Sequence, residues 1–352
     1  MASAAPEPLP QPGTGSAGSA RVVVAGSINM DVVAQVARLP LPGETVRGTA
    51  LAFHPGGKGA NQAIAAARAG STVTLLACLG SDPYADELEA FLAANGVEVA
   101  GVRREPGAVT GVALILVDAV GENTIVSVPG ANALLGPAAV TAVPGPGDVL
   151  LAQFETPRAT THAFFAAGRQ AGSVTVLNAA PAADPVDLLA LTDVLVVNEI
   201  ELAMCAGEPA SGEVEPPPGP GEPRSGGEPR SGPGEGEVGP GDSTAEIVAV
   251  ARRLQARGPA VVVVTLGGRG VVALDGPGVH ELAAYPVAAV DATGAGDCFT
   301  GSLAARLAAR DAFGEALAYA NAAASICVER PGAGPSMPDA AEVRARLRGR
   351  GQ

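Results

Sequence analysis

The chain has 352 residues, of which 47% are hydrophobic and 3% aromatic. This length allows one large α/β domain or two ordinary domains, each with a full core, and excludes a miniature protein held together by disulfides. The formal net charge of -14 argues against a nucleic-acid-binding protein, because such proteins need a basic face that neutralises phosphates.

The first segment, 1–20, consists mainly of Ala, Ser, Pro and Gly and lacks the apolar stretch of a signal peptide. We expect a disordered tail there and another tail at 346–352. No apolar run approaches the ~20 residues that span a bilayer, so we expect a soluble protein without a membrane partner. The four cysteines have no paired spacing, which favours a reducing compartment. The cytoplasm is the expected location, and a small soluble chain could also enter the nucleus.

From residue 21 onward, short β-branched runs alternate with Ala-rich stretches of helical periodicity. Several runs are apolar throughout, which is typical of parallel strands buried on both faces. The expected strands are 22–25, 73–77, 149–151, 174–177, 194–197 and 261–265, and the expected helices are 58–69, 84–94, 245–257, 297–310 and 315–328. The alternation predicts one α/β domain over 21–345, with a doubly wound, mostly parallel sheet and flanking helices.

Two segments, about 38–53 and 112–128, interrupt the alternation. In the second, residues 112–117 and 124–128 flank a polar turn, which predicts a β-hairpin. We assign both segments to a small β-sheet lid over a ligand site. A third interruption, 208–242, is rich in Pro, Gly, Glu and Ser and cannot bury enough apolar surface to offset its ordering entropy, so a disordered insertion is expected.

The segment Asp291-Ala-Thr-Gly-Ala-Gly-Asp297 follows the apolar run 287–290 and begins a helix. Glycines at such a strand-to-helix turn direct backbone N–H groups to one point, where the helix N-terminus favours an anion. A carboxylate at Asp297 would repel a phosphate unless it takes a proton from an attacking hydroxyl, so the segment indicates phosphoryl transfer with a base. The alternative is that Asp297 caps the helix and the glycines only form a turn.

Two further polar segments lie in the first half of the chain. The first, 54–62, is glycine-rich but is neither a Walker A loop nor a dinucleotide-binding motif. Its Gly56, Gly57, Lys58 and Asn61 combine backbone access, a cation and an amide, which suits a polyhydroxylated ligand. The second, 26–31, is expected at the carboxyl end of the first strand, where open α/β sheets bind ligands.

Together the three segments resemble the ribokinase family, the phosphofructokinase-B-type carbohydrate and nucleoside kinases, over about 21–338. Gly-Ala-Gly-Asp at 294–297 is shared by the whole family, and Gly-Gly-Lys-Gly-Ala-Asn-Gln at 56–62 is typical of its ribose kinases. The resemblance implies a ribokinase-like fold and ATP-dependent phosphorylation of D-ribose at its 5-hydroxyl, with Asp297 as the general base. It also implies Mg²⁺ with ATP, K⁺ as an activating cation, and a homodimer formed through the lid.

The resemblance also implies three sets of site residues. The sugar site would contain Asn29, Asp31, Gly57, Lys58, Asn61, Glu155 and Asp297. The nucleotide site would contain Asn198, Thr265, Leu266, Gly267, Gly268, Arg269, Gly270, Gly294, Ala295, Gly296 and Asn321, with Glu201 near Mg²⁺. The monovalent cation would lie among Asp291, Thr293, Cys327, Arg330, Gly332 and Ser336. For Asn198 and Glu201 an ordinary helix cap is the alternative.

Some features depart from the family pattern, and other functions remain open. Ala292 and Cys298 replace the usual hydroxyl residues, and the insertion at 208–242 is unlike compact relatives. A kinase of the same family acting on fructose, deoxyribose, pseudouridine or adenosine is one alternative, and a non-catalytic sugar- or nucleotide-binding regulator is another. A Rossmann oxidoreductase would need a G-x-G-x-x-G motif after the first strand, which 26–31 does not contain.

Overall fold

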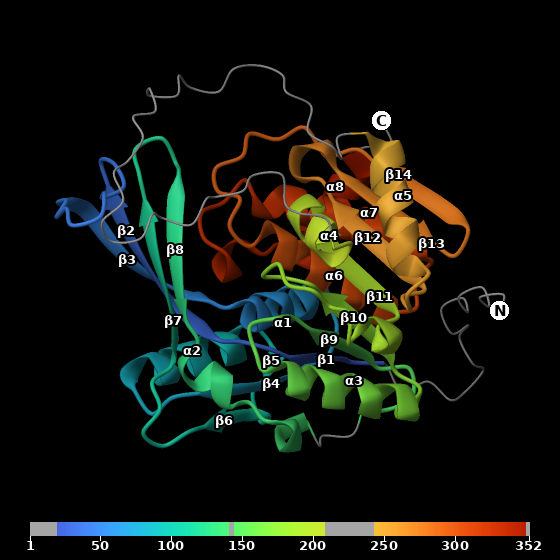
Figure 1. Cartoon of the computed structure of the whole chain (residues 1–352), viewed down its shortest axis with the longest axis horizontal. Coiled ribbons are helices and arrows are strands. Elements are labelled where there is room, and N and C mark those ends of the chain that lie inside the picture. Colours follow the sequence, from blue (N-terminus) through green and yellow to red (C-terminus); the bar gives the residue numbers. More distant parts are fainter. Residues whose placement is uncertain (1–19, 141–143, 208–242, 350–352) are drawn as a thin grey trace.

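The computed structural model describes residues 20–140, 144–207 and 243–349. The insertion expected at 208–242 and nearly all of the tail expected at 1–20 lie outside these residues. A large sheet is covered by helices on both faces, and a smaller sheet projects from one edge (Figure 1). No helix in the described ranges is both long enough and apolar enough to cross a membrane.

The large sheet has ten strands in the order β14-β13-β12-β11-β10-β9-β1-β4-β5, with β6 also paired to β4. Its strands are β1 (Val22–Ala25), β4 (Val73–Leu79), β5 (Val97–Glu98), β6 (Val102–Arg104), β9 (Val149–Ala152), β10 (Val174–Asn178), β11 (Val194–Asn198), β12 (Val261–Thr265), β13 (Val271–Asp275) and β14 (Gly278–Leu282). All pairs are parallel except β12 with β13 and β13 with β14. The predicted doubly wound, mostly parallel sheet is confirmed, with each of its six expected strands.

Strand order reverses at β1, which pairs with β4 on one side and with β9 on the other. Both β1 and β9 are buried at every position, as expected for parallel strands between two helical layers. In doubly wound sheets, ligands bind outside the carboxyl ends of the strands at this point of reversal. The fold therefore directs attention to the residues that follow Ala25 and Ala152.

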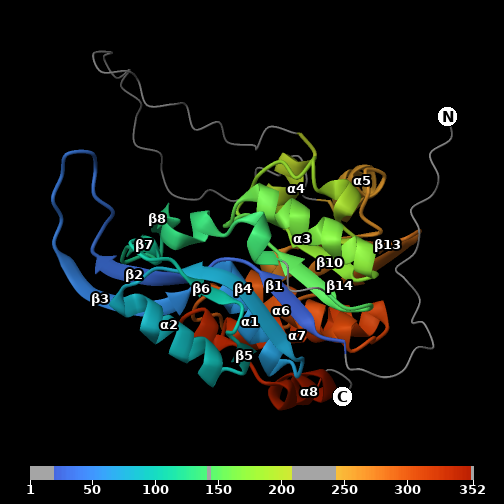
Figure 2. The same ribbon diagram turned by 90° about the horizontal axis from the view of Figure 1, so that it is seen from below.

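Helices cover the two faces of the sheet in separate groups (Figure 2). One face carries α3 (Arg158–Ala171), α4 (Glu199–Cys205) and α5 (Thr244–Gln255), and the other carries α1 (Lys58–Arg68), α2 (Pro83–Ala94), α6 (Ala295–Ala308), α7 (Phe313–Cys327) and α8 (Ala340–Gly349). Short 3₁₀ helices occur at η1 (Gly130–Leu134), η2 (Pro137–Val140), η3 (Leu189–Leu191), η4 (Gly267–Arg269) and η5 (Gly334–Ser336). The five expected helices are present. The last helix, α8, continues to Gly349, so the domain extends four residues past its predicted end at 345.

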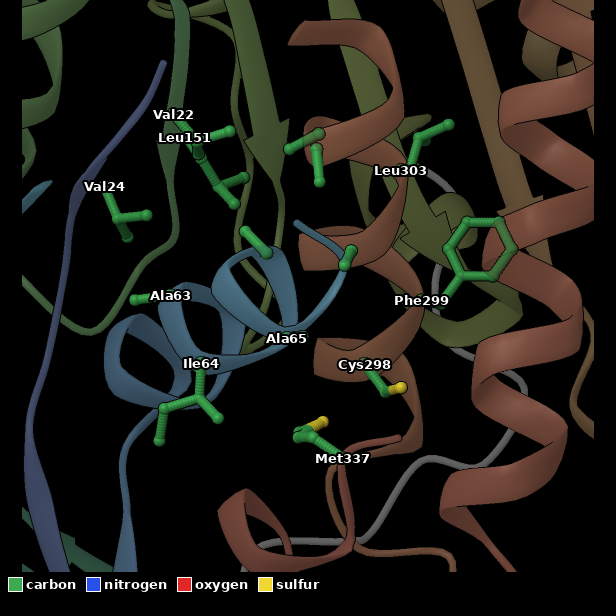
Figure 3. Packing of buried hydrophobic residues seen from close by; sticks show 14 of the residues in the cluster. Val22, Val24, Ala63, Ile64, Ala65, Leu151, Cys298, Phe299, Leu303 and Met337 are labelled. Atoms are coloured by element: carbon green, nitrogen blue, oxygen red, sulfur yellow. The ribbon is translucent and has the colours of Figure 1, made fainter. Parts of the chain in front are cut away.

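Helices α1 and α6 approach each other closely because small residues line their contact (Figure 3). A Cβ added to Gly301 of α6 would lie 2.3 Å from the Gln62 carbonyl oxygen and 2.8 Å from the Ala65 side chain. Figure 3 shows α1 beside the α6 residues Cys298 and Leu303, with Ala63 on the side of α1 that faces away from α6. This short separation brings the start of α1 next to the start of α6.

The smaller sheet, called the lid sheet below, has the order β3-β2-β7-β8. It contains β2 (Asn29–Val36), β3 (Gly48–Gly56), β7 (Gly111–Val117) and β8 (Asn123–Val128). β7 and β8 form an antiparallel pair, which confirms the predicted hairpin. β2 is antiparallel to β3 and parallel to β7.

The observed strands of the lid sheet differ from the expected segments. Residues 38–47 contain no strand, whereas residues 29–36 form the inner strand β2. The prediction that Asp31 lies at the end of the first strand is therefore wrong. The chain turns out of the main sheet after Ala25 and enters the lid sheet at Asn29, so the polar cluster 26–31 bridges the two sheets.

Candidate active site

The three polar segments meet near the carboxyl ends of β1 and β9. Gly26 and Gly59 touch, since a Cβ on Gly59 would lie 2.5 Å from the Gly26 carbonyl carbon. Glu155, just past β9, accepts hydrogen bonds from the Ser27 hydroxyl and from the Lys58 backbone N–H, the latter at 3.0 Å. One carboxylate thus ties β1 and α1 to β9.

Asp297 lies in the first turn of α6 and is 7% exposed. The amide of Asn61 donates to its Oδ2 at 3.0 Å, and the amide of Gln62 donates to its Oδ1 at 2.8 Å. Both donors lie on α1, so the close packing of α1 and α6 sets the position of this carboxylate. The hydrogen bonds come from side chains, so Asp297 is more than a helix cap.

The glycine turn before Asp297 is held in one conformation. Gly294 adopts φ 77°, in the left-handed region, and a Cβ there would lie 2.8 Å from that of Ala333. Around Gly296, by contrast, no atom of the described residues would lie within 4 Å of an added Cβ. The start of α6 therefore has open space beside backbone N–H groups that lack helical partners.

The segment before this turn differs from the prediction. Residues 283–289 form neither helix nor strand, and the Val290 N–H donates to the Val328 carbonyl at 2.7 Å. The expected strand over 287–290 is therefore wrong, because the backbone of this run bonds to the end of α7 instead of to a sheet. The glycine turn still begins α6 as predicted.

Lys58 is partly buried and interacts with the charges of four carboxylates. Burial acts to lower the pKa of Lys58, but the charges of Asp297, Glu155, Glu201 and Asp31 outweigh it and raise that pKa. The pocket therefore holds one cation among several acidic groups. Ammonium and carboxylate groups in this arrangement suit the hydroxyls of a polyol.

Asp31 is the most strongly perturbed of these carboxyl groups. Its pKa is raised to about 7, first by burial and then by the charges of Glu155 and Asp297, against a lowering effect of Lys58. Its side chain fills the space beside Gly56, where a Cβ would lie 2.1 Å from an Asp31 carboxyl oxygen. Glycine at position 56 is thus required by contact with Asp31.

Asn29 is held by a residue that the sequence did not indicate. The Asn132 amide donates to Asn29 Oδ1 at 2.8 Å and to the Ile28 carbonyl at 3.0 Å, and it accepts from the Ile28 N–H at 3.0 Å. A Cβ on Gly111 would lie 2.3 Å from Asn29 Oδ1, which leaves no room for a side chain there. Asn132 thus fixes the turn between the two sheets.

Asn61 has an unpaired hydrogen-bond acceptor. Its Oδ1 is buried and has no hydrogen-bond partner within the described part of the chain. Buried polar atoms are rarely left unpaired, so an unpaired acceptor on a side chain that also donates to Asp297 indicates a place for a ligand hydroxyl.

The residues expected on the nucleotide side form two groups, one at the ends of β11 and β12 and the other beside the segment 282–284. Asn198 and Thr265 are directly paired across β11 and β12. Gly270 packs against the strand end at Leu282, where a Cβ would lie 2.0 Å from the Leu282 carbonyl oxygen, and Asn321 donates to the adjacent Ala283 carbonyl at 2.9 Å. The segment 282–284 thus connects the loop 265–270 to Asn321.

The helix-cap alternative for Asn198 and Glu201 is present in the structure. The Asn198 side chain accepts from the Glu201 N–H at 2.8 Å, and the Glu201 carboxylate accepts from the Asn198 N–H at 2.8 Å, which is a complete capping box. Burial raises the pKa of Glu201, with an opposing effect of its bond to Asn198. Arg269, in η4, forms an ion pair with Glu199, which begins the same helix α4 as Glu201.

The residues expected around a monovalent cation lie in two contacting loops. Asp291 accepts from the Thr293 N–H at 2.9 Å and from the Gly332 N–H at 2.8 Å, and Cys327 Sγ lies 3.0 Å from Ser336 Oγ. The Arg330 side chain instead forms an ion pair with Glu342. The Asp291 carboxylate thus links the two segments.

Several residues that contact the proposed site groups, directly or through Gln62, were not singled out from the sequence. They are Ser27, Gln62, Asn132, Gln153 and Asn178. A signal existed for some of them: Gln62 ends the segment 56–62, Gln153 follows the fully apolar strand β9, and Asn178 ends β10, which is apolar except for Thr175. For Asn132, in a short 3₁₀ helix, the sequence has no comparable signal.

Comparison with known proteins identifies relatives over nearly the whole chain. The model of the pfkB family carbohydrate kinases matches residues 19–340. A bifunctional ribokinase/ribose-5-phosphate isomerase A of Fructilactobacillus sanfranciscensis is 34% identical over 325 residues, which are 90% of this chain and 54% of that protein. A ribokinase of Haemophilus influenzae is 32% identical over 326 residues, which are 92% of this chain and 96% of that protein.

Solved structures agree with this result. The ribokinase of Thermotoga maritima superposes with a TM-score of 0.77 at 29% identity, covering 94% of this chain and 99% of that one. The ribokinase of Arabidopsis thaliana, solved with ribose and ATP, superposes with a TM-score of 0.78 at 28% identity and the same coverage. With a family match across almost all of its residues and a ribokinase-like fold, this chain belongs to the pfkB family of carbohydrate kinases.

Proposed function

We propose that the chain transfers the γ-phosphoryl group of ATP to the 5-hydroxyl of D-ribose, producing D-ribose 5-phosphate and ADP. The observation that carries this proposal is the buried carboxylate of Asp297 at the open N-terminus of α6, held by two amides of α1. The relatives named ribokinase and the Arabidopsis ribokinase structure with ribose and ATP support the choice of sugar.

On the sugar side, the pocket around Lys58 would bind the ribose hydroxyls. Carboxylates at Asp31 and Glu155 would accept hydrogen bonds, and the ammonium of Lys58 would donate them. Asn61 would accept one more through its unpaired Oδ1. Asn29 and the backbone at Gly57 would complete the site, since Gly57 has φ 91° and a Cβ there would lie 2.7 Å from the Asn29 nitrogen.

The reaction would begin with Asp297 accepting the proton of the 5-hydroxyl as the oxygen attacks the γ-phosphorus. The oxygen–phosphorus bond to ADP breaks as the new bond forms, and the backbone N–H groups at Gly294, Ala295 and Gly296 would stabilise the charge on the transferred group. The lid sheet carries Asn29 and Asp31, so sugar binding would draw the lid over the site and exclude water.

On the nucleotide side, the loop Thr265, Leu266, Gly267, Gly268, Arg269 and Gly270 would bind ATP together with Asn198 and Asn321. Mg²⁺ bound to ATP would supply positive charge against the phosphates. Glu201 fits a role near that ion because it is a carboxylate, 7% exposed, on the Lys58 side of α4.

We include K⁺ activation in the proposal. The loops of Asp291, Thr293, Cys327, Arg330, Gly332 and Ser336 fit a monovalent cation through their carbonyl oxygens, which keep a second lone pair when one is hydrogen-bonded. The proposal also comprises a cytoplasmic location and a homodimer formed through the lid sheet.

The test is ADP release by the purified chain with Mg²⁺ and ATP, with and without K⁺, across ribose, deoxyribose, fructose, adenosine and pseudouridine. We expect turnover with ribose and stimulation by K⁺. Preferential turnover with deoxyribose would favour the second candidate, since a deoxyribokinase of Salmonella typhi is 30% identical over 288 residues. No turnover with any of these substrates would contradict the proposed function.

Asp297→Asn is expected to lower kcat by roughly 10²–10⁴-fold, because an amide cannot accept the proton, while ribose affinity changes much less. Asp148→Asn is the matched control. Asp148 is 6% exposed and paired with Arg21 at the start of β1, so its loss should lower stability but leave turnover intact. Unchanged kcat in Asp297→Asn would rule out Asp297 as the base.

A further inference from the structure

A row of buried amide side chains lies behind Asp297. Gln62 and Gln153 are both 0% exposed, and Asn178 is 7% exposed. They come from α1, from the residue after β9 and from the end of β10. Buried amides are found where their hydrogen bonds specify one arrangement, so the direction of each bond matters.

The bonds fix which way the Gln62 amide faces. Gln153 Nε2 donates to Gln62 Oε1 at 2.5 Å, so the carbonyl of Gln62 is an acceptor. Gln62 Nε2 then donates to Asp297 Oδ1 at 2.8 Å and to Asn178 Oδ1 at 2.9 Å, which uses both of its hydrogens. Asn178 is itself oriented, because its Nδ2 donates to the Val196 carbonyl at 3.2 Å.

Reversing the Gln62 amide would be unfavourable. It would bring Gln62 Oε1 against the acceptor oxygens of Asp297 and Asn178, and it would leave the Gln153 donor facing an N–H group. Gly26 leaves space for the Gln153 end of this row, since a Cβ there would lie 2.3 Å from Gln153 Oε1. The row therefore has one favourable arrangement, with an N–H directed at Asp297.

The two oxygens of Asp297 are held differently. Oδ1 is held by Gln62, whose other contacts are all buried. Oδ2 is held by Asn61, which borders the sugar pocket and has an unpaired Oδ1 of its own. Both Nε2 hydrogens of Gln62 are used by buried acceptors, whereas Asn61 makes a single side-chain bond, to Asp297, so Oδ2 is the oxygen with the less constrained partner.

We infer that Gln62 is a positioning residue that fixes Asp297 through Oδ1 and leaves Oδ2 to take the proton of the sugar hydroxyl. This inference rests on the proposed function. A donor to a carboxylate stabilises its ionised form, so removal of the Gln62 donor should disfavour that form of the base. Gln153 and Asn178 act through Gln62.

The test compares Gln62→Met and Gln62→Glu with the wild type in ribose phosphorylation, measured as kcat, KM and the pH dependence of kcat/KM. Gln62→Met removes the donor at similar side-chain length. We expect kcat to fall roughly 10–100-fold with KM for ribose within about 3-fold, and the acid limb of the profile to move up by about one pH unit. Gln62→Glu places a second carboxyl group against Asp297, so the acid limb should move further, by about two units.

Gln255→Met is the matched control. Gln255 is 4% exposed and its amide donates to the Ala260 and Gly276 carbonyls on the far side of α5. The same chemical change there should lower the melting temperature without moving kcat or the pH profile. If Gln62→Met does not fold, Gln153→Met decides the matter, because it removes only the donor that orients Gln62 and should move the acid limb the same way by a smaller amount.

The outcomes separate the two ideas. Wild-type turnover with a shifted acid limb in the Gln62 variants, or in Gln153→Met, supports the inference. Wild-type turnover with the kinetics and pH profile of these variants unchanged, or altered only as in Gln255→Met, overturns the inference and leaves the proposed function intact. Absence of wild-type turnover overturns the proposed function and the inference with it.

Discussion

At the scale of single residues, the site gathers charged groups whose burial is unfavourable, because buried charges are less hydrated and less screened than charges in water. Lys58 interacts with the charges of Asp31, Glu155, Glu201 and Asp297, and burial disfavours ionisation of Asp31 and Glu201. Such an arrangement is unfavourable in the empty protein and favourable once hydroxyl groups satisfy it. Function therefore lowers stability at this point of the fold.

The unfavourable burial of charge at Asp31 can be measured as a pH dependence of stability. Because its folded pKa is raised to about 7, the protonated form favours folding, and this contribution is present at low pH and lost as pH rises through about 7. The amide in Asp31→Asn cannot ionise, so the stability of this variant should not fall with pH for this reason. We expect the melting temperature of the variant, relative to wild type, to rise by roughly 2–4 °C between pH 5 and pH 8.

Thermal unfolding of both proteins at the two pH values checks this. The same variant should bind ribose more weakly, because an amide offers one acceptor oxygen where the carboxylate offers two. A difference in melting temperature that stays constant with pH would contradict the raised pKa. Asp184→Asn, at an exposed turn whose carboxylate accepts from the Val186 N–H at 3.0 Å, provides the control for a general effect of charge.

The sequence was sufficient for some site residues and not for others. Lys58, Asn61 and Asp297 lie in segments whose composition alone indicates a ligand, and the structure brings them together. Gln62 is adjacent to Asn61 in the sequence, but its role depends on facing two amides from other strands. Such a contact arises from packing of β9, β10 and α1, which composition does not reveal.

At the scale of elements, the link between the two sheets depends on one side chain. Asn132 makes three hydrogen bonds to Ile28 and Asn29, where the chain passes from β1 to β2. It is 1% exposed, so water cannot replace those bonds. A carboxamide is the only side-chain group of this size that both donates and accepts here.

Asn132→Leu has nearly the same shape without the polar atoms. It would leave the Ile28 N–H and carbonyl and the Asn29 side chain unpaired, and we expect a loss of about 2–3 kcal/mol in the free energy of unfolding. Because Asn29 is released, KM for ribose should rise about tenfold, with a smaller change in kcat. Urea unfolding and steady-state kinetics measure the two effects.

Asn95→Leu is a suitable comparison. The Asn95 amide bonds to Phe91 and Arg68 at the end of α2 and lies outside the group of residues around Asp297. It should lower stability and leave KM unchanged. An unchanged KM in Asn132→Leu as well would show that Asn29 does not contribute to sugar binding.

The elements themselves were predictable where burial is complete. The apolar runs at β1, β9 and β12 could only be strands between two layers. β2 lies between β3 and β7, and its pairing with β7 joins segments about eighty residues apart, which the local sequence does not mark. The run 287–290 was taken for a strand since it is apolar, although its backbone hydrogen bonds go to α7.

At the scale of the whole molecule, the two faces of the lid sheet differ. The register places Phe53, Val32, Leu114 and Val126 in one row across β3, β2, β7 and β8. Side chains alternate along each strand, so this row lies on the face opposite to Asp31. Leu51, Phe53, Leu114 and Val126 are 60%, 46%, 46% and 55% exposed. An apolar patch of this kind is typical of a surface that another protein covers.

The proposed homodimer would bury the face of the lid sheet opposite to Asp31, called the outer face below. We expect light scattering of the purified chain at micromolar concentration to give twice the mass of one chain. Val126→Glu should shift it to the mass of one chain, because a carboxylate in the centre of an apolar interface must lose its hydration. Ile125→Glu is the control, since Ile125 is on the same strand and is also 55% exposed but lies on the Asp31 face. If both variants stay dimeric, the lid is not the interface; if both become monomeric, the contact is not confined to the outer face.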